Sequence, residues 1–202
     1  MKHILIIFSL FLTFTSVAFE GIIHGTKIQD GVTTRFHFFV RENQIAIVSD
    51  TPEGNYKILV SSNRQEVKIC MDSPLFEEKG YYSILKDEVE KNQIPKIQRQ
   101  TKTDALMIDG FNCEGYTLVS DIGTAIAYIG PENINLSGLS AFFNDPLYEL
   151  LDAFQIEKLP RKIVVNKTTG SYTIDLTAEE TRLDPSIFEV PQEMKQFQVT
   201  LE

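Results

Sequence analysis

Regular alternation of apolar and polar side chains is the feature that most constrains how this chain can fold. In the segment 55–62, Tyr56, Ile58 and Val60 occupy every second position. An extended strand places every second side chain on the same face, so this spacing predicts a half-buried antiparallel strand with one apolar face. The same pattern recurs in the segments 34–41, 65–72, 162–165 and 172–176.

Short turn sequences separate these strands. Glycine, asparagine, aspartate and proline are concentrated in them, as tight turns between paired strands require. Consecutive hairpins predict a meander of about nine to eleven strands, and no repeat or linker divides the chain. The turn segments are 29–31, 41–43, 52–54, 121–123 and 167–170.

One segment, 135–154, has helical spacing instead. Its apolar side chains recur every three or four residues, which builds one stripe on a helix. Asp145 and Pro146 form a helix start inside it, so two short helices with a break are expected. The charge-rich segment 81–93 could form a further short helix. A curved antiparallel sheet with a few short helices on one face, an α+β fold, accommodates these patterns. The stripe consists of Leu136, Leu139, Phe143, Leu147, Leu150 and Phe154.

Residues 1–18 read MKHILIIFSLFLTFTSVA, which has the three parts of an export signal. Lys2 is the positive start, an apolar run follows, and Ser16 and Ala18 are small residues before the cleavage site. A membrane anchor is the alternative, but the run is shorter than the roughly 20 residues that span a bilayer. We expect a cleaved signal peptide, a single domain over residues 19–202, no transmembrane segment in the mature chain, and the bacterial periplasm as the compartment.

The charge balance of the chain excludes one class of partner. Its 202 residues include 19 lysines and arginines against 28 aspartates and glutamates, a net charge of −9. Nucleic-acid binding depends on basic side chains that neutralise phosphates, so no nucleic-acid partner is expected.

Two cysteines, Cys70 and Cys113, follow the expected cleavage site. In an oxidising compartment they could form a disulfide, worth about 4 kcal/mol by the chain-entropy estimate. Strand parity favours two independent thiols, because Cys70 shares its parity with the polar residues Lys68 and Asp72, whereas Cys113 shares its parity with Phe111. Both alternatives stay open.

No sequence motif supplies catalytic or metal-binding chemistry. His24 and His37, the histidines of the mature chain, lie in strand patterns without metal-ligand spacing, so both are expected to be solvated or hydrogen-bonded surface residues. Nucleophile elbows, phosphate loops and dinucleotide fingerprints are also missing. We therefore expect no cofactor, no metal and no enzymatic activity. A pocket gathering polar groups around either histidine would argue for an enzyme.

Apolar side chains on the strand faces and on the helical stripe are the candidate ligand-binding residues. In one interpretation they simply fill the core between sheet and helices. In the other, the two layers close incompletely and leave an apolar groove for a hydrophobic ligand. The candidates are Phe36, Phe38, Val40, Ile58, Val60, Leu139, Phe142, Phe143, Leu150 and Phe154.

Three stretches of the chain resemble a known family. They are FEGIIHGTKI at residues 19–28, IDGFNCEGYTLVSDIGTAIAYI at 108–129, and LPRKIVVNKTTGSYTIDL with LDPSIFEVPQEMK at 159–176 and 183–195. Together they resemble domain-of-unknown-function family 4412, exported bacterial proteins common in Bacteroidetes, with the weakest match in 72–103. The family has no assigned activity, so the resemblance implies no catalytic residue.

That family is similar in architecture to the LolA-like superfamily of periplasmic lipoprotein carriers. The resemblance implies an unclosed half-barrel whose concave face is covered by lid helices from 135–154. The expected function is a soluble periplasmic binding protein for a lipid, an acyl chain or a lipoprotein. The alternative is a non-enzymatic envelope module with a fully packed core that binds an envelope protein partner.

Overall fold

The computed structural model describes residues 19–51, 54–72, 79–87, 97–140, 142, 146–167 and 169–197. Twelve strands of these residues form one sheet in the order β12-β6-β5-β4-β3-β2-β1-β11-β10-β9-β8-β7. In chain order the elements are β1 (Glu20–Gln29), β2 (Val32–Arg41), β3 (Gln44–Thr51), β4 (Gly54–Val60), β5 (Glu66–Asp72), β6 (Gly80–Leu85), β7 (Ile97–Ile108), β8 (Phe111–Ser120), β9 (Gly123–Ile129), α1 (Pro146–Ala153), β10 (Pro160–Lys167), β11 (Gly170–Glu180), the 3-10 helix η2 (Pro185–Phe188) and β12 (Lys195–Gln196).

Two antiparallel meanders make up the sheet. Strands β1 to β6 follow one another on one side, and β7 to β11 follow one another on the other. They are joined where β11 pairs with β1, from Gly21 opposite Glu180 to Gln29 opposite Tyr172. The short β12 runs parallel to β6, so the sheet is mixed at that edge. The sequence predicted nine to eleven strands, and the described residues form twelve. Strand β12 was missed because two residues are too few to show an alternating pattern.

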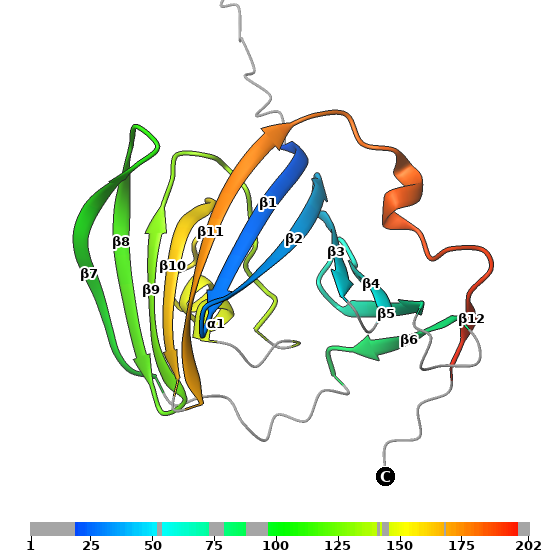
Figure 1. Cartoon of the computed structure of the whole chain (residues 1–202), viewed down its shortest axis with the longest axis horizontal. Helices are drawn as coiled ribbons and strands as arrows, with labels where there is room; N and C mark the ends of the chain where they lie inside the picture. Colours follow the sequence, from blue (N-terminus) through cyan, green and yellow to red (C-terminus); the bar gives the residue numbers. More distant parts are fainter. Residues whose placement is uncertain are drawn as a thin grey trace, which may run out of the picture.

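The sheet is curved and does not close, since β12 and β7 stand at its two ends. In Figure 1, β7 to β11 stand beside β1 and β2 as a curved wall, and α1 lies inside the curve. Helix α1 contacts β8, β9 and β10. The predicted fold class, an unclosed half-barrel with little helix on its concave face, is confirmed.

The turn between β1 and β2 shows why its sequence predicted a hairpin. Gln29 pairs with Val32, so Asp30 and Gly31 form a two-residue loop. Both have positive φ, 51° and 78°. A type I′ turn requires this left-handed conformation at both central positions, and aspartate followed by glycine adopts it at low cost.

The main core lies between the concave face and the residues that cover it. Ile23, Ile163 and Leu150 are fully buried there, one each from β1, β10 and α1. A smaller cluster, around Leu59 and Cys70, lies on the opposite face and packs against the segment 187–194.

This second cluster explains an exception to the alternation. Phe39 is an apolar residue on the otherwise polar face of β2, and it packs in this cluster. The C-terminal segment 181–197 covers it and is held to the sheet by Lys57, whose Nζ donates to the carbonyl oxygens of Ser186 at 3.3 Å and Glu189 at 2.7 Å.

The prediction of two helices in 135–154 is half right. Helix α1 begins at Pro146, where the sequence placed a helix start. Residues 135–140 are not helical. The Asn135 side chain accepts hydrogen bonds from the backbone N and Oγ of Ser137, at 2.8 and 2.6 Å, and Gly138 has φ of 78°. A local turn therefore replaces the helix, while Leu136 and Leu139 are still buried.

The suggestion of a helix in 81–93 is wrong where the structure describes it. Tyr81 and Tyr82 belong to strand β6 and pair with Cys70 and Ile69 of β5. Their backbone groups form hydrogen bonds with β5, and this pairing outweighs the local preference for a helix that the charged residues suggested. Residues 88–93 lie outside the described residues.

A single carboxylate joins α1 to the turn that precedes it. Asp152 accepts hydrogen bonds from the backbone N of Gly138 and from the backbone N and Oγ of Ser140. Residues 135–140 and α1 therefore form one unit over the concave face, which we call the cover.

Replacing Asp152 by alanine is expected to destabilise the protein by about 1–3 kcal/mol, because two backbone amides and a hydroxyl lose their acceptor. Asp152→Asn keeps one oxygen acceptor and should cost less. Urea unfolding followed by circular dichroism measures both, with Glu180→Ala at an exposed position as the control. Equal stability of Asp152→Ala and the wild type would contradict the role given to this carboxylate.

Candidate functional site

An apolar cavity of about 240 Å³ lies between the sheet and the cover. It is half-enclosed, with strands from both meanders on one side and the cover on the other. Among the described residues, every lining side chain except that of Tyr148, which carries a hydroxyl, is a hydrocarbon. The lining residues are Phe36, Phe38, Ile47, Ile58, Leu136, Leu147, Tyr148, Pro160, Ile163, Ile174 and Leu176.

Phe36 holds its place in the wall of this cavity because of a glycine. It lies directly opposite Gly25 on β1. A Cβ at Gly25 would lie only 2.2 Å from Cε2 of the Phe36 ring, so the ring covers the glycine. The ring also meets Phe38 edge to face, with centroids 5.4 Å apart. These two contacts position Phe36 toward the cavity.

The predicted ligand-binding residues are distributed over three places. Phe36, Phe38 and Ile58 line the apolar cavity. Val40, Val60, Leu139 and Leu150 are buried in the main core and do not line the cavity, while Phe142 packs partly buried against that core. Phe154 lines a second cleft, and Phe143 lies outside the described residues.

Several cavity residues were not among the predicted ones. Ile163 and Ile174 belong to the alternating pattern of β10 and β11, so their parity was visible in the sequence. That these strands lie beside β2 was not visible, because it follows from the pairing of β1 with β11.

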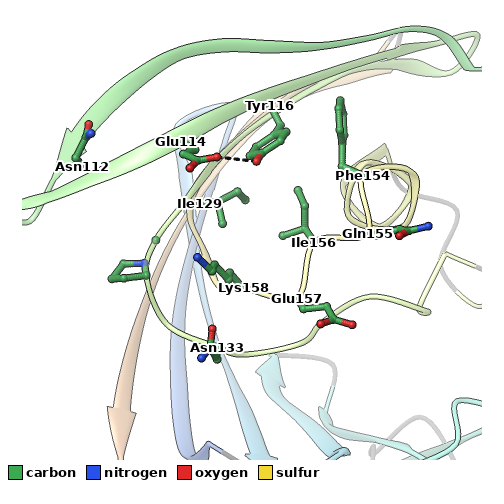
Figure 2. A pocket seen from close by; sticks show the side chains of 12 residues that line it. Asn112, Glu114, Tyr116, Ile129, Asn133, Phe154, Gln155, Ile156, Glu157 and Lys158 are labelled. Atoms are coloured by element: carbon green, nitrogen blue, oxygen red, sulfur yellow. Dashed lines mark hydrogen bonds between the residues drawn. The ribbon is translucent and has the colours of Figure 1, made fainter. Parts of the chain in front are cut away.

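The second cleft, of about 690 Å³, has polar and aromatic walls and is called the mixed cleft here. Figure 2 shows Phe154, directly after α1, near Tyr116 of β8; their ring centroids are 5.0 Å apart. The Tyr116 hydroxyl donates to Glu114 Oε2 at 2.8 Å. The lining residues are Asn112, Glu114, Tyr116, Ile129, Gly130, Pro131, Asn133, Phe154, Gln155, Ile156, Glu157 and Lys158.

Two titratable groups of the mixed cleft, Glu114 and Tyr116, have pKa values shifted away from neutrality. The hydrogen bond from Tyr116, and then the nearby Lys102, lower the pKa of Glu114. Burial, together with the hydrogen bond to Glu114, raises the pKa of Tyr116. An acid or base working near neutral pH needs a pKa near 7, and both groups are shifted away from it.

A buried arginine, Arg161, lies beside Gly130, one of the residues that line the mixed cleft. Arg161 is 8% exposed, forms an ion pair with Glu132, and lies with its guanidinium carbon 4.0 Å from the centroid of the Phe111 ring. A Cβ at Gly130 would lie 2.5 Å from Glu132 Oε2. A larger residue at position 130 would therefore require the Glu132 carboxylate to shift.

Cys70 and Cys113 are both buried free thiols. Seven strands separate β5 from β8 in the sheet order, in keeping with the parity argument against a disulfide. Burial raises the pKa of each thiol. A thiol becomes reactive through a lowered pKa and exposure, so neither is set up as a nucleophile.

His24 and His37 face one another across β1 and β2, with their Nδ1 atoms 3.0 Å apart. The Nε2 atom of His24 is 3.2 Å from Glu179 Oε2. Both were expected to be hydrogen-bonded or solvated surface residues, and neither lines the apolar cavity or the mixed cleft. In the part of the chain that the structure describes, no three histidine, cysteine, aspartate or glutamate side chains gather as a metal site.

Helix α1 is short, and within the described ranges no helix has both the length and the apolar character needed to cross a membrane.

No family model matches this chain, and no curated protein matches it by sequence. Solved structures resemble it only remotely. The protein PNGF-II matches with 14% identity and a TM-score of 0.45, over 89% of this chain and 30% of its own length. MucB, solved in complex with MucA, matches with 7% identity and a TM-score of 0.45, over 89% and 57%. A domain from Vibrio parahaemolyticus, described as an outer membrane lipoprotein-sorting protein, matches with 8% identity and a TM-score of 0.33, over 83% and 88%.

This chain therefore spans less than two thirds of PNGF-II and of MucB. At these TM-scores and identities the matches carry no argument about family or function. Membership of family 4412 stays a prediction.

The Gly25→Ala substitution is expected to push the Phe36 ring out of its position, at a cost of about 1–3 kcal/mol. In a Phe36→Leu background the same substitution should cost less, because the obstructing ring is gone. A double-mutant cycle from urea unfolding measures this coupling. Strictly additive costs would show that Gly25 is required for another reason.

Proposed function

We propose that the chain is an exported periplasmic binding protein that holds an acyl chain or another slender apolar group. The observation that carries the proposal is the apolar cavity between the sheet and the cover. Small-molecule sites are concave and mostly apolar, and closely packed protein interiors rarely leave voids of this kind. Its described lining contains no charged side chain and is almost entirely hydrocarbon, which suits an apolar ligand.

The size of the cavity limits the ligand. A methylene is about as large as a water molecule, whose share of liquid volume is about 30 Å³, so the cavity holds about eight methylenes. Burying them contributes about 6 kcal/mol at roughly 0.8 kcal/mol each, before the cost of association. Binding of a single acyl chain is therefore expected in the range of tens of micromolar or weaker. A whole lipid would leave its headgroup outside.

The compartment belongs to the same proposal. Residues 1–18 have the composition of an export signal, and the resemblance to family 4412 and to LolA-like carriers points to the periplasm. Phe19, the first described residue, already packs against the main core. Removal of the signal would therefore leave β1 and the packing of Phe19 against the core intact, with residues 19–202 as one domain.

The ligand proposal is tested by titrating the protein with a fluorescent medium-chain fatty acid. Ile58→Trp should fill the cavity and weaken binding at least tenfold, because Ile58 is part of its lining. Phe36→Ala should enlarge the cavity and shift the preference to longer chains. Val32→Trp, at an apolar residue 66% exposed and outside the cavity, is the matched control and should bind like the wild type.

Thermal melting of each variant verifies that it is folded, since overpacking can itself cost about 1–3 kcal/mol. No uptake by the wild type, together with no lipid in native mass spectra of freshly purified protein, would overturn the proposal. The alternative of a protein-interaction module with a packed core would then be favoured.

The export proposal predicts that the chain, produced at full length in a Gram-negative bacterium, is recovered from the periplasm with Phe19 as its first residue. Intact-mass measurement checks the position. Ala18→Lys should block cleavage by placing a large charged side chain where a small one is needed. A periplasmic product that retains residues 1–18 would contradict the cleavage site.

A further inference from the structure

We propose that His24 and His37 form a binding site for a late first-row divalent cation, Cu²⁺ above all. The site lies on the face of the sheet away from the cover, because His24 has the opposite parity to Ile23, which is fully buried in the main core. It is independent of the apolar cavity and of the proposed acyl-chain ligand.

The geometry of the pair is close to that of two ligands on one metal ion. The two histidines are directly opposite on neighbouring strands, and their rings are nearly perpendicular, at 88°. Imidazole nitrogens bind such ions at about 2.0–2.1 Å, so two nitrogens at an angle of about 90–109° are about 2.8–3.4 Å apart. The observed separation of the Nδ1 atoms, 3.0 Å, falls in this range.

The carboxylate of Glu179 fixes which nitrogen of His24 carries the proton. Glu179 Oε2 accepts a hydrogen bond from His24 Nε2, at 3.2 Å, so the neutral His24 ring presents a lone pair at Nδ1. The Nδ1–H of His37 then donates to that lone pair. Metal binding requires this proton to move to Nε2 of His37 and the two rings to turn, so that both Nδ1 lone pairs point at the ion instead of at each other. A carboxylate that orients a histidine ligand in this way typically strengthens metal binding.

The chemistry of the pair selects the ion. Imidazole suits zinc, copper and nickel, and among divalent ions of this series copper binds most tightly. Two protein ligands leave the remaining positions to water, which the tetragonal geometry of Cu²⁺ accepts. His24 is 42% exposed in its side chain, so the ion has access. The thiols of Cys70 and Cys113 are fully buried and do not compete.

The neighbouring charges are mixed. Glu179 is 64% exposed in its side chain and brings one negative charge to the pair. Arg35, two residues along β2 from His37, is exposed and brings a positive one. The site therefore depends on the two nitrogens and their supporting carboxylate rather than on a general negative potential.

Titration of the untagged protein that begins at Phe19, with residues 1–18 removed, tests the proposal with Cu²⁺ as the probe. One tight site is expected, with an electron paramagnetic resonance spectrum showing two coordinated histidine nitrogens and with weaker binding of Zn²⁺ and Ni²⁺. His24→Gln and His37→Gln should each lower the Cu²⁺ affinity at least tenfold and abolish the two-nitrogen spectrum.

The supporting carboxylate has its own matched control. Glu179→Gln should weaken Cu²⁺ binding about tenfold or more, as loss of a supporting hydrogen bond typically does. Glu180→Gln, the next residue on the strand, should have no effect. Unchanged Cu²⁺ affinity in His37→Gln, or a wild-type spectrum without two histidine nitrogens, would overturn the proposal. Circular dichroism establishes that each surface variant keeps the fold.

Discussion

The pairing of β1 with β11 is the contact on which the rest of the structure depends. It joins the N-terminal meander to the C-terminal one through a continuous ladder from Gly21 to Gln29. Strands β2 to β4 and strands β10 and β11 line the apolar cavity together only because this ladder places them in one sheet. The same ladder brings Glu179 of β11 beside His24 of β1. Both proposed sites therefore combine residues that are more than a hundred positions apart in the chain.

The cover decides how much of the concave face remains accessible. Helix α1 and the turn before it are joined by Asp152, and together they bury Leu136, Leu139 and Leu150. Directly after the cover, Phe154 contacts Tyr116 at the mixed cleft. The side chains of the cover do not fill the space above β2, β3 and β4, and the apolar cavity remains there. A cavity of that size suits an acyl chain rather than a large rigid ligand.

Sequence patterns were reliable where the cause of a structure is local. Alternation placed β2, β4, β5, β10 and β11, and the residues Asp30 and Gly31 predicted the turn between β1 and β2. The helix start at Pro146 was also found. The pattern failed at 135–140, where helical spacing of leucines is real but Asn135 and Gly138 form a turn instead. Leucines three residues apart can be buried whether the backbone forms a turn or a helix, so their spacing alone does not distinguish the two.

The sequence by itself determined strands β2, β4, β5, β10 and β11, most of the turns, the parity of the apolar faces of these strands and the start of α1, because each of these depends on residues close together in the chain. Only the tertiary structure decided which apolar residues line a cavity and which fill the core. Phe36 and Val40 share one face of β2, yet the first lines the cavity and the second is 3% exposed in the core. The difference depends on what packs above each residue, and the pairing of distant strands and the position of the cover set that packing.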